Sequence, residues 1–183
     1  MKKIGIFMAD GCEEIEALTT VDILRRAKID IDMISINGKS EVTGSHNITF
    51  KCDKVISEAD FSGYDGLVLP GGLPGTTNLG AHKTVVEKVG EFAEAGKLVA
   101  AICAAPTVPG DNGILEGKRA TCYPGCEDRL TGAEIVDEQV VVDGNIITGR
   151  AMGAAIPFAL EIVRYCTDDN TADSIRDGIV WIY

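Results

Sequence analysis

The stretch LVAAICAAPTVPG, residues 98–110, decides the fold of this chain. Its first five residues are apolar and predict a short buried strand that ends at Cys103. Small residues and Pro106 follow at once, so the chain turns directly from the strand into a helix. Pro109 and Gly110 then allow only a short or bent helix. A buried strand that leads directly into a helix is the repeating unit of a parallel α/β sheet.

The rest of the sequence repeats this alternation. Short apolar runs rich in β-branched residues alternate with segments whose apolar residues recur at helical spacing. We predict strands at residues 3–8, 30–36, 66–69, 98–102, 119–123, 140–142 and 146–148, and helices at 14–27, 82–95, 154–166 and 171–176. Asp143-Gly144 predicts a hairpin turn between the last two strands, and residues 42–56 contain less regular strand-like pieces. Because no repeat or linker divides the sequence, we expect one α/β domain over residues 1–183 with a mostly parallel central sheet.

Composition narrows the classes of partner. The 183 residues are 45% hydrophobic and 25% charged, with a formal net charge of -11. No basic stretch is present that would neutralise phosphates, so nucleic-acid binding is not expected. Acidic residues interrupt the apolar N-terminus, and no run approaches the roughly 18 apolar residues of a membrane span. We therefore expect a cytoplasmic protein that is not bound to membranes.

The six cysteines are scattered, and the only histidines are His46 and His82. No CxxC pair is present, whereas a structural zinc site usually has closely paired ligands. We therefore expect reduced thiols and no metal.

Three features fall at the edge where a parallel sheet binds its ligands, beyond the carboxyl ends of the strands. They are residues 10–16, Gly71-Gly72 and Cys103. A sharp turn whose neighbouring residues are small exposes its central side chain to the cleft, and here that side chain is Cys103. The turn also places Cys103 at a helix N-terminus, where the thiolate form is favoured. We expect Cys103 to be a nucleophile with a lowered pKa, and the backbone N–H groups of Ala104 and of Gly71-Gly72 to form an oxyanion hole. The alternative is an inert core cysteine.

A cysteine nucleophile needs a group that moves its proton, and this sequence offers no obvious histidine. His82 is predicted at the start of a helix as a solvated residue, and His46 lies in the unclear segment. Glu16 lies in the first helical turn at the correct edge and has the chemistry for proton transfer. The residues alone do not distinguish Glu16 from Glu13 or Glu14.

Five motifs make the sequence resemble the ThiJ/PfpI superfamily, close to its Parkinsonism-associated protein deglycase branch. The resemblance covers nearly the whole chain, and the motifs occur in the family's order. They are GCEEIEA at 11–17, VDILRRA at 21–27, LPGGLPGTTNL at 69–79, AAICAAPT at 100–107 and ITGRAMG at 147–153.

The resemblance implies a flavodoxin-like three-layer sandwich and a homodimer with the helix at 14–27 near its interface. It implies that Cys103 is the reactive cysteine and Glu16 its acidic partner, with Gly72 and Ala104 as oxyanion donors. The implied activity is a cofactor-independent glyoxalase or deglycase, acting on methylglyoxal or on early glycation adducts of proteins or nucleotides. The alternative is a non-enzymatic oxidative-stress sensor or chaperone in which the same cysteine is oxidised.

Two departures from the family pattern concern the rim of the site. Tyr123 stands where many relatives have a histidine, which argues against a Cys-His dyad and against protease activity. His46 stands where the deglycase has an arginine in an anion pocket, whereas Arg150 is retained. We expect His46, Tyr123 and Arg150 to contact substrate.

Overall fold

A twisted seven-stranded sheet forms the centre of the computed structural model, which describes residues 2–182. The strand order is β10-β11-β7-β6-β1-β2-β5. The pairs from β11 to β5 are parallel, and the hairpin of β10 and β11 is antiparallel. The strands are β1 (Lys3–Met8), β2 (Asp30–Ser35), β5 (Lys54–Val55), β6 (Gly66–Leu69), β7 (Leu98–Ile102), β10 (Val140–Asp143) and β11 (Ile146–Gly149). The fold is the predicted three-layer α/β sandwich with a mostly parallel sheet.

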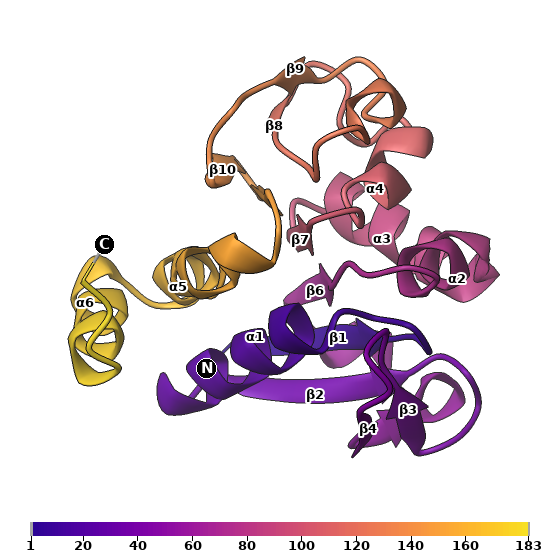
Figure 1. Cartoon of the computed structure of the whole chain (residues 1–183), viewed down its shortest axis with the longest axis horizontal. Coiled ribbons are helices and arrows are strands. Elements are labelled where there is room, and N and C mark those ends of the chain that lie inside the picture. The colour runs from indigo at the N-terminus through magenta and orange to yellow at the C-terminus, as the bar shows by residue number, and fades with distance from the viewer. Residues whose placement is uncertain (1, 183) are drawn as a thin grey trace.

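Helices cover both faces of this sheet (Figure 1). One face carries α1 (Glu14–Arg26), α5 (Ala155–Cys166) and α6 (Asp169–Gly178), and the other carries α2 (Gly75–Ala81), α3 (Lys83–Glu94) and α4 (Thr107–Asp111). Short 3₁₀ turns lie at Ile56–Glu58, Phe61–Gly63, Glu127–Arg129 and Met152–Ala154. None of the helices in the described part of the chain has the length and apolar character needed to cross a bilayer.

Alternation along β1 shows how the sequence builds two cores. Ile4, Ile6 and Met8 belong to the cluster that includes residues of α1 and α5. Phe7 and Ala9 belong to the cluster on the opposite face, with residues of α2 and α3. Successive side chains of a strand point to opposite faces, so a strand that is apolar at every position must be covered on both sides.

The structure differs from the predicted elements in two places and resolves a third that was left irregular. Helix α2 was not predicted, because its GTTNLGA sequence contains two glycines and lacks an apolar stripe. The strand predicted at 119–123 is only β8 (Arg119–Ala120), which pairs with β9 (Glu134–Ile135) in a separate small sheet. Beyond β8, the N–H of Tyr123 instead donates to the carbonyl of Cys103 at 2.7 Å. The irregular segment 42–56 contains a hairpin of β3 (Glu41–Thr43) and β4 (Thr49–Lys51), followed by β5.

Candidate active site

Backbone hydrogen bonds join four segments in two pairs at the carboxyl edge of the sheet. The N–H of Glu13, just before α1, donates to the carbonyl of Gly71 after β6 at 2.9 Å. The N–H of Cys103, just after β7, donates to the carbonyl of Gly149 at the end of β11, also at 2.9 Å. Sequence reasoning missed Gly149, although its place at the end of a strand next to β7 is a usable signal.

Cys103 lies in a sharp turn between β7 and the following helical segment. Its φ is +65°, in the left-handed region that residues with a side chain seldom adopt. Such conformations cost free energy and recur at functional sites, including the turns that present a nucleophile. The thiol is partly exposed, whereas Ile102 and Ala104 on either side are buried. The turn therefore separates Cys103 from its core neighbours.

Glu16 is the one of the three glutamates at the start of α1 that reaches Cys103. Its side chain is fully buried, and its carboxylate acts on the Cys103 thiol, whose pKa it raises. Oε2 accepts the N–H of Gly71 at 2.9 Å, and Oε1 has no protein partner among the described residues. Glu13 and Glu14 instead bond to the segment around His46.

Gly71 makes this close approach possible. A Cβ at position 71 would lie 2.6 Å from Cβ of Cys103 and 2.7 Å from Oε2 of Glu16, and both separations are too short for any side chain. The backbone therefore approaches the thiol and the carboxyl only because residue 71 is glycine.

Burial raises the pKa of both groups. Burial raises the pKa of Glu16 to about 7, although its hydrogen bonds with Cys103 and Gly71 act in the opposite direction. Burial and the Glu16 carboxylate raise the pKa of Cys103 to about 12, against the backbone N–H groups of Gly72 and Ala104. The lowered thiol pKa expected from the sequence is therefore wrong, because the thiol is partly desolvated and lies beside the Glu16 carboxyl group. Near neutral pH the thiol keeps its proton, and Glu16 is positioned to accept it.

The predicted oxyanion donors have different partners. The backbone N–H groups of Gly72 and Ala104 face the Cys103 thiol and lower its pKa. The N–H of Gly71 is already used by Glu16. Gly72 and Ala104 therefore remain as the candidate donors to an oxygen that forms on a carbon bound to the sulfur, and Gly71 positions Glu16.

The structure links the predicted rim residues to the Cys103 thiol less directly than it links Glu16. Tyr123 is joined to Cys103 through its backbone, and its side chain is half exposed. The guanidinium of Arg150 pairs with Asp137. His46 bonds to Glu14, while His82 caps α3 and lines a different hollow with Asp10 and Asn37.

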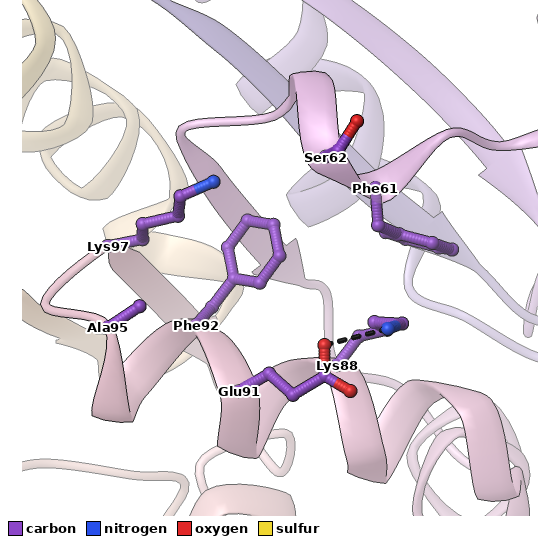
Figure 2. A pocket seen from close by; sticks show the side chains of 7 residues that line it. All are labelled: Phe61, Ser62, Lys88, Glu91, Phe92, Ala95 and Lys97. Carbon is purple, nitrogen blue, oxygen red and sulfur yellow. Dashed lines mark hydrogen bonds and ion pairs between the residues drawn. The ribbon is translucent and has the colours of Figure 1, made fainter.

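A hollow of about 270 Å³ lies apart from Cys103 and Glu16 (Figure 2). Figure 2 shows Lys88 turned toward Glu91, with which it pairs at 2.7 Å. Lys97 is also occupied, because it donates to the carbonyl of Tyr64 at 2.6 Å. The Ser62 hydroxyl is also occupied, because it donates to Asp60 at 2.7 Å. The polar groups of the hollow are therefore used within the protein. Its lining residues are Phe61, Ser62, Lys88, Glu91, Phe92, Ala95 and Lys97.

Fold and site together define a class: an α/β sandwich with a cysteine at a strand-to-helix turn, beside a buried glutamate. Residues 2–165 match the DJ-1/PfpI family. The chain belongs to that family.

Full-length relatives and solved structures agree with this assignment. Protein dj-1beta of Drosophila melanogaster is 34% identical over 184 residues, covering 100% of this chain and 98% of that protein. The crystal structure of a cysteine-to-alanine mutant of a Salmonella typhimurium DJ-1 superfamily protein has a TM-score of 0.95 and 35% identity, covering 100% of both chains. Toxoplasma gondii DJ-1, solved in an oxidized form, has a TM-score of 0.96 at 30% identity, also with 100% of both chains covered.

Some relatives are much longer than this chain. Protein DJ-1 homologs B and A of Arabidopsis thaliana are 38% and 40% identical over 162 residues, which is 88% of this chain. The match spans only 37% and 41% of their lengths.

Proposed function

We propose that this protein is a cofactor-independent glyoxalase- or deglycase-like enzyme with a stress-protective role in the cytoplasm. Its substrates are methylglyoxal or early glycation adducts of proteins or nucleotides. One observation carries the proposal: the buried carboxyl group of Glu16, whose pKa is about 7, lies beside Cys103 across the backbone of Gly71. A group whose pKa lies near the working pH is best suited to accept a proton and to return it.

In the first step, the sulfur of Cys103 attacks the aldehyde carbon while its proton passes to the Glu16 carboxylate. The product is a hemithioacetal, and the N–H groups of Gly72 and Ala104 stabilise the oxygen that becomes negative. Because the thiol is protonated at neutral pH, Glu16 acts here as a general base.

Glu16 first returns the thiol proton to the oxygen of the hemithioacetal. As a carboxylate again, it moves a proton from the former aldehyde carbon to the neighbouring carbon, while the hydroxyl proton passes to the neighbouring oxygen. This converts the hemithioacetal into a thioester, which water hydrolyses to lactate with release of the thiol. Overall, one methylglyoxal and one water give one lactate, so no oxidant, reductant or cofactor enters the balance.

The rim beyond Cys103 would set the choice of substrate. Tyr123 and Met152 are about half exposed, and Leu73, next to Gly72, is more exposed. We assign the aromatic ring of Tyr123 to contact with the body of the substrate. Arg150 is assigned to its charged groups, whereas His46 is turned toward Glu14.

Turnover of methylglyoxal without glutathione tests the proposal. Protein dialysed free of metal should form lactate, and Cys103→Ser should abolish it because serine is a poorer nucleophile without a stronger base. Glu16→Gln should reduce the rate by about 10² to 10⁴, the usual cost of losing an acid/base group. Cys166→Ser, at the far end of α5, is the matched control and should retain activity. Lactate formation that survives Cys103→Ser would refute the covalent mechanism.

A redox sensor is the second candidate, because Glu16 is positioned to donate a hydrogen bond to an oxidised Cys103. In that case the wild type would show negligible turnover. Mild peroxide would give one stable sulfinate at Cys103, and Glu16→Gln would alter its yield.

We also propose a homodimer that uses the start of α1. Ile15 on that helix and Ile48 beside it are each about half exposed, although both are large and apolar. They are linked locally, because Glu14, the neighbour of Ile15, accepts the N–H of Ile48 at 3.4 Å. Apolar side chains of this size on a surface often mark a contact between chains.

A further inference from the structure

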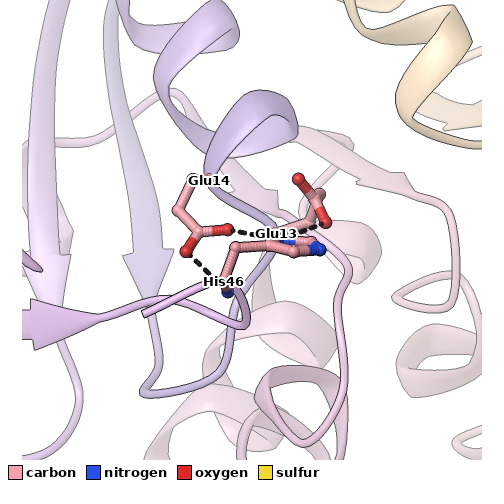
Figure 3. Close-up of side chains that lie close together, drawn as sticks. All are labelled: Glu13, Glu14 and His46. Carbon is pink, nitrogen blue, oxygen red and sulfur yellow. Dashed lines mark hydrogen bonds and ion pairs between the residues drawn. The ribbon is translucent and has the colours of Figure 1, made fainter. Parts of the chain in front are cut away.

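Four polar side chains from two segments meet away from Cys103, and Figure 3 shows three of them, Glu13, Glu14 and His46. Glu13 and Glu14 lie at the start of α1, and Ser45 and His46 lie in the loop between β3 and β4. One ligand atom from each of Glu13, Glu14 and His46 lies within 4.8 Å of the other two. Figure 3 shows both carboxylates turned toward the imidazole. The two segments are about thirty residues apart in the sequence, so this set of donors arises only from the tertiary structure.

The spacing of these atoms suits a small cation. Nδ1 of His46 lies 3.0 Å from Oε2 of Glu14 and 3.4 Å from Oε2 of Glu13. Oγ of Ser45 lies 3.4 Å from each of these carboxylate oxygens and 3.1 Å from Nδ1. Ligands held about 2.0–2.2 Å from one ion are separated from each other by about 3.0–3.5 Å. Most of these separations are long for hydrogen bonds to a carboxylate, which are typically about 2.5–2.9 Å.

The two oxygens of Glu14 have separate tasks. Oε1 accepts the backbone N–H groups of His46 at 2.8 Å and Ile48 at 3.4 Å, and so holds the loop against the helix. Oε2 is left to face His46, Ser45 and Glu13. The loop must pass close to allow this, because a Cβ at Gly44 would lie 2.3 Å from the Glu14 carboxyl carbon. The backbone of the loop is thus held in place whatever binds the four remaining atoms. These atoms are Oε2 of Glu13, Oε2 of Glu14, Oγ of Ser45 and Nδ1 of His46.

Charge also favours a cation at this place. The side chain of Glu14 is 2% exposed and that of Glu13 is 12% exposed. Two poorly solvated carboxylates side by side repel each other unless a positive charge lies between them. His46 is 67% exposed, so further positions around an ion would be open to water.

We propose that Glu13, Glu14, Ser45 and His46 form a binding site for one divalent transition-metal ion of the zinc class. Carboxylate oxygens together with an imidazole nitrogen favour such ions over Mg²⁺ or Ca²⁺, which prefer all-oxygen sites. The bound ion would fix the β3–β4 loop to the start of α1, one helical turn before Glu16. The site is independent of the carbonyl chemistry proposed for Cys103, and it binds no atom of that thiol. No local pattern of residues predicts this site, because the expectation of no metal rested on cysteine and histidine spacing.

Calorimetric titration with zinc chloride tests the site on full-length protein that has been stripped of metal. The variants are His46→Asn and Glu13→Gln, with His82→Asn as the matched control at the only other histidine. All four proteins keep the six cysteines, so zinc bound by thiols contributes equally to each. Circular dichroism confirms that each variant is folded, which the exposure of His46 favours.

We expect the four-residue site to bind one zinc ion per chain in the wild type. The zinc affinity should be weakened about tenfold or more in His46→Asn and Glu13→Gln, and it should be unchanged in His82→Asn. In nitrogen-15 spectra of the two imidazoles, zinc should shift the ring signals of His46 and leave those of His82 in place. Equal zinc affinity in all four proteins, or no binding apart from that of the thiols, would overturn the proposal. Neither result depends on lactate formation, so it leaves the proposed enzyme activity unaffected.

Discussion

Replacing Glu16 by glutamine should stabilise the protein at alkaline pH while it removes activity. The ordinary pKa of glutamate is 4.5, and burial raises that of Glu16 to about 7 in the folded protein. Between these two values the folded protein holds a proton that the unfolded chain has lost. The free energy of unfolding of the wild type therefore falls as pH rises through this interval, and it is level above it.

The size of the effect follows from the two pKa values. Each tenfold change in proton affinity corresponds to about 1.4 kcal/mol, so complete ionisation of Glu16 costs about 3 kcal/mol of stability. Glutamine has the same shape, and its amide oxygen can still accept the N–H of Gly71. It has no charge to bury, so this cost is absent. Relative to the wild type, Glu16→Gln should gain about 2 kcal/mol between about pH 5 and about pH 8.

Urea unfolding followed by circular dichroism at several pH values in this range measures the difference. Glu134→Gln, a change at an exposed glutamate on β9, is the control and should show no such trend. Glu16 would ionise normally if the free energies of unfolding of Glu16→Gln and the wild type differed by the same amount at both ends of the pH range. That result would refute both the raised pKa and the general-base step that depends on it.

Three further predictions concern the same site and its surroundings. The rate of lactate formation should fall as pH decreases through about 7, because Glu16 must be ionised to accept the thiol proton; a rate that is flat from about pH 6 to about pH 8 would contradict this role. Gly71→Ala should lower stability by about 1–3 kcal/mol and remove most turnover, since its methyl group would collide with Cys103 and Glu16; normal kinetics in this variant would show that the close approach is unnecessary. Sedimentation equilibrium should give twice the chain mass of 19.4 kDa, and Ile15→Glu should shift the protein toward monomer; a monomeric wild type at micromolar concentration would exclude the dimer.

The sequence by itself determined the class of fold and the place of Cys103 in it. Strands β1, β6 and β7 are apolar at nearly every position, and only a sheet covered on both faces can bury such strands. Parallel strands align their carboxyl ends, so Cys103 and Gly71 had to lie on one edge whatever the details of packing. These features depend on local periodicity and chain topology, which can be read directly from residue order.

Only the tertiary structure decided which glutamate is the partner of Cys103 and how the thiol is charged. Glu13, Glu14 and Glu16 are equivalent in sequence, but the orientation of α1 on the sheet buries Glu16 against Cys103 and turns the other two toward His46. The raised pKa of Cys103 likewise depends on burial and on a carboxyl group distant in the sequence. Burial and long-range contacts are properties of the packed chain, so no local pattern of residues could have predicted them.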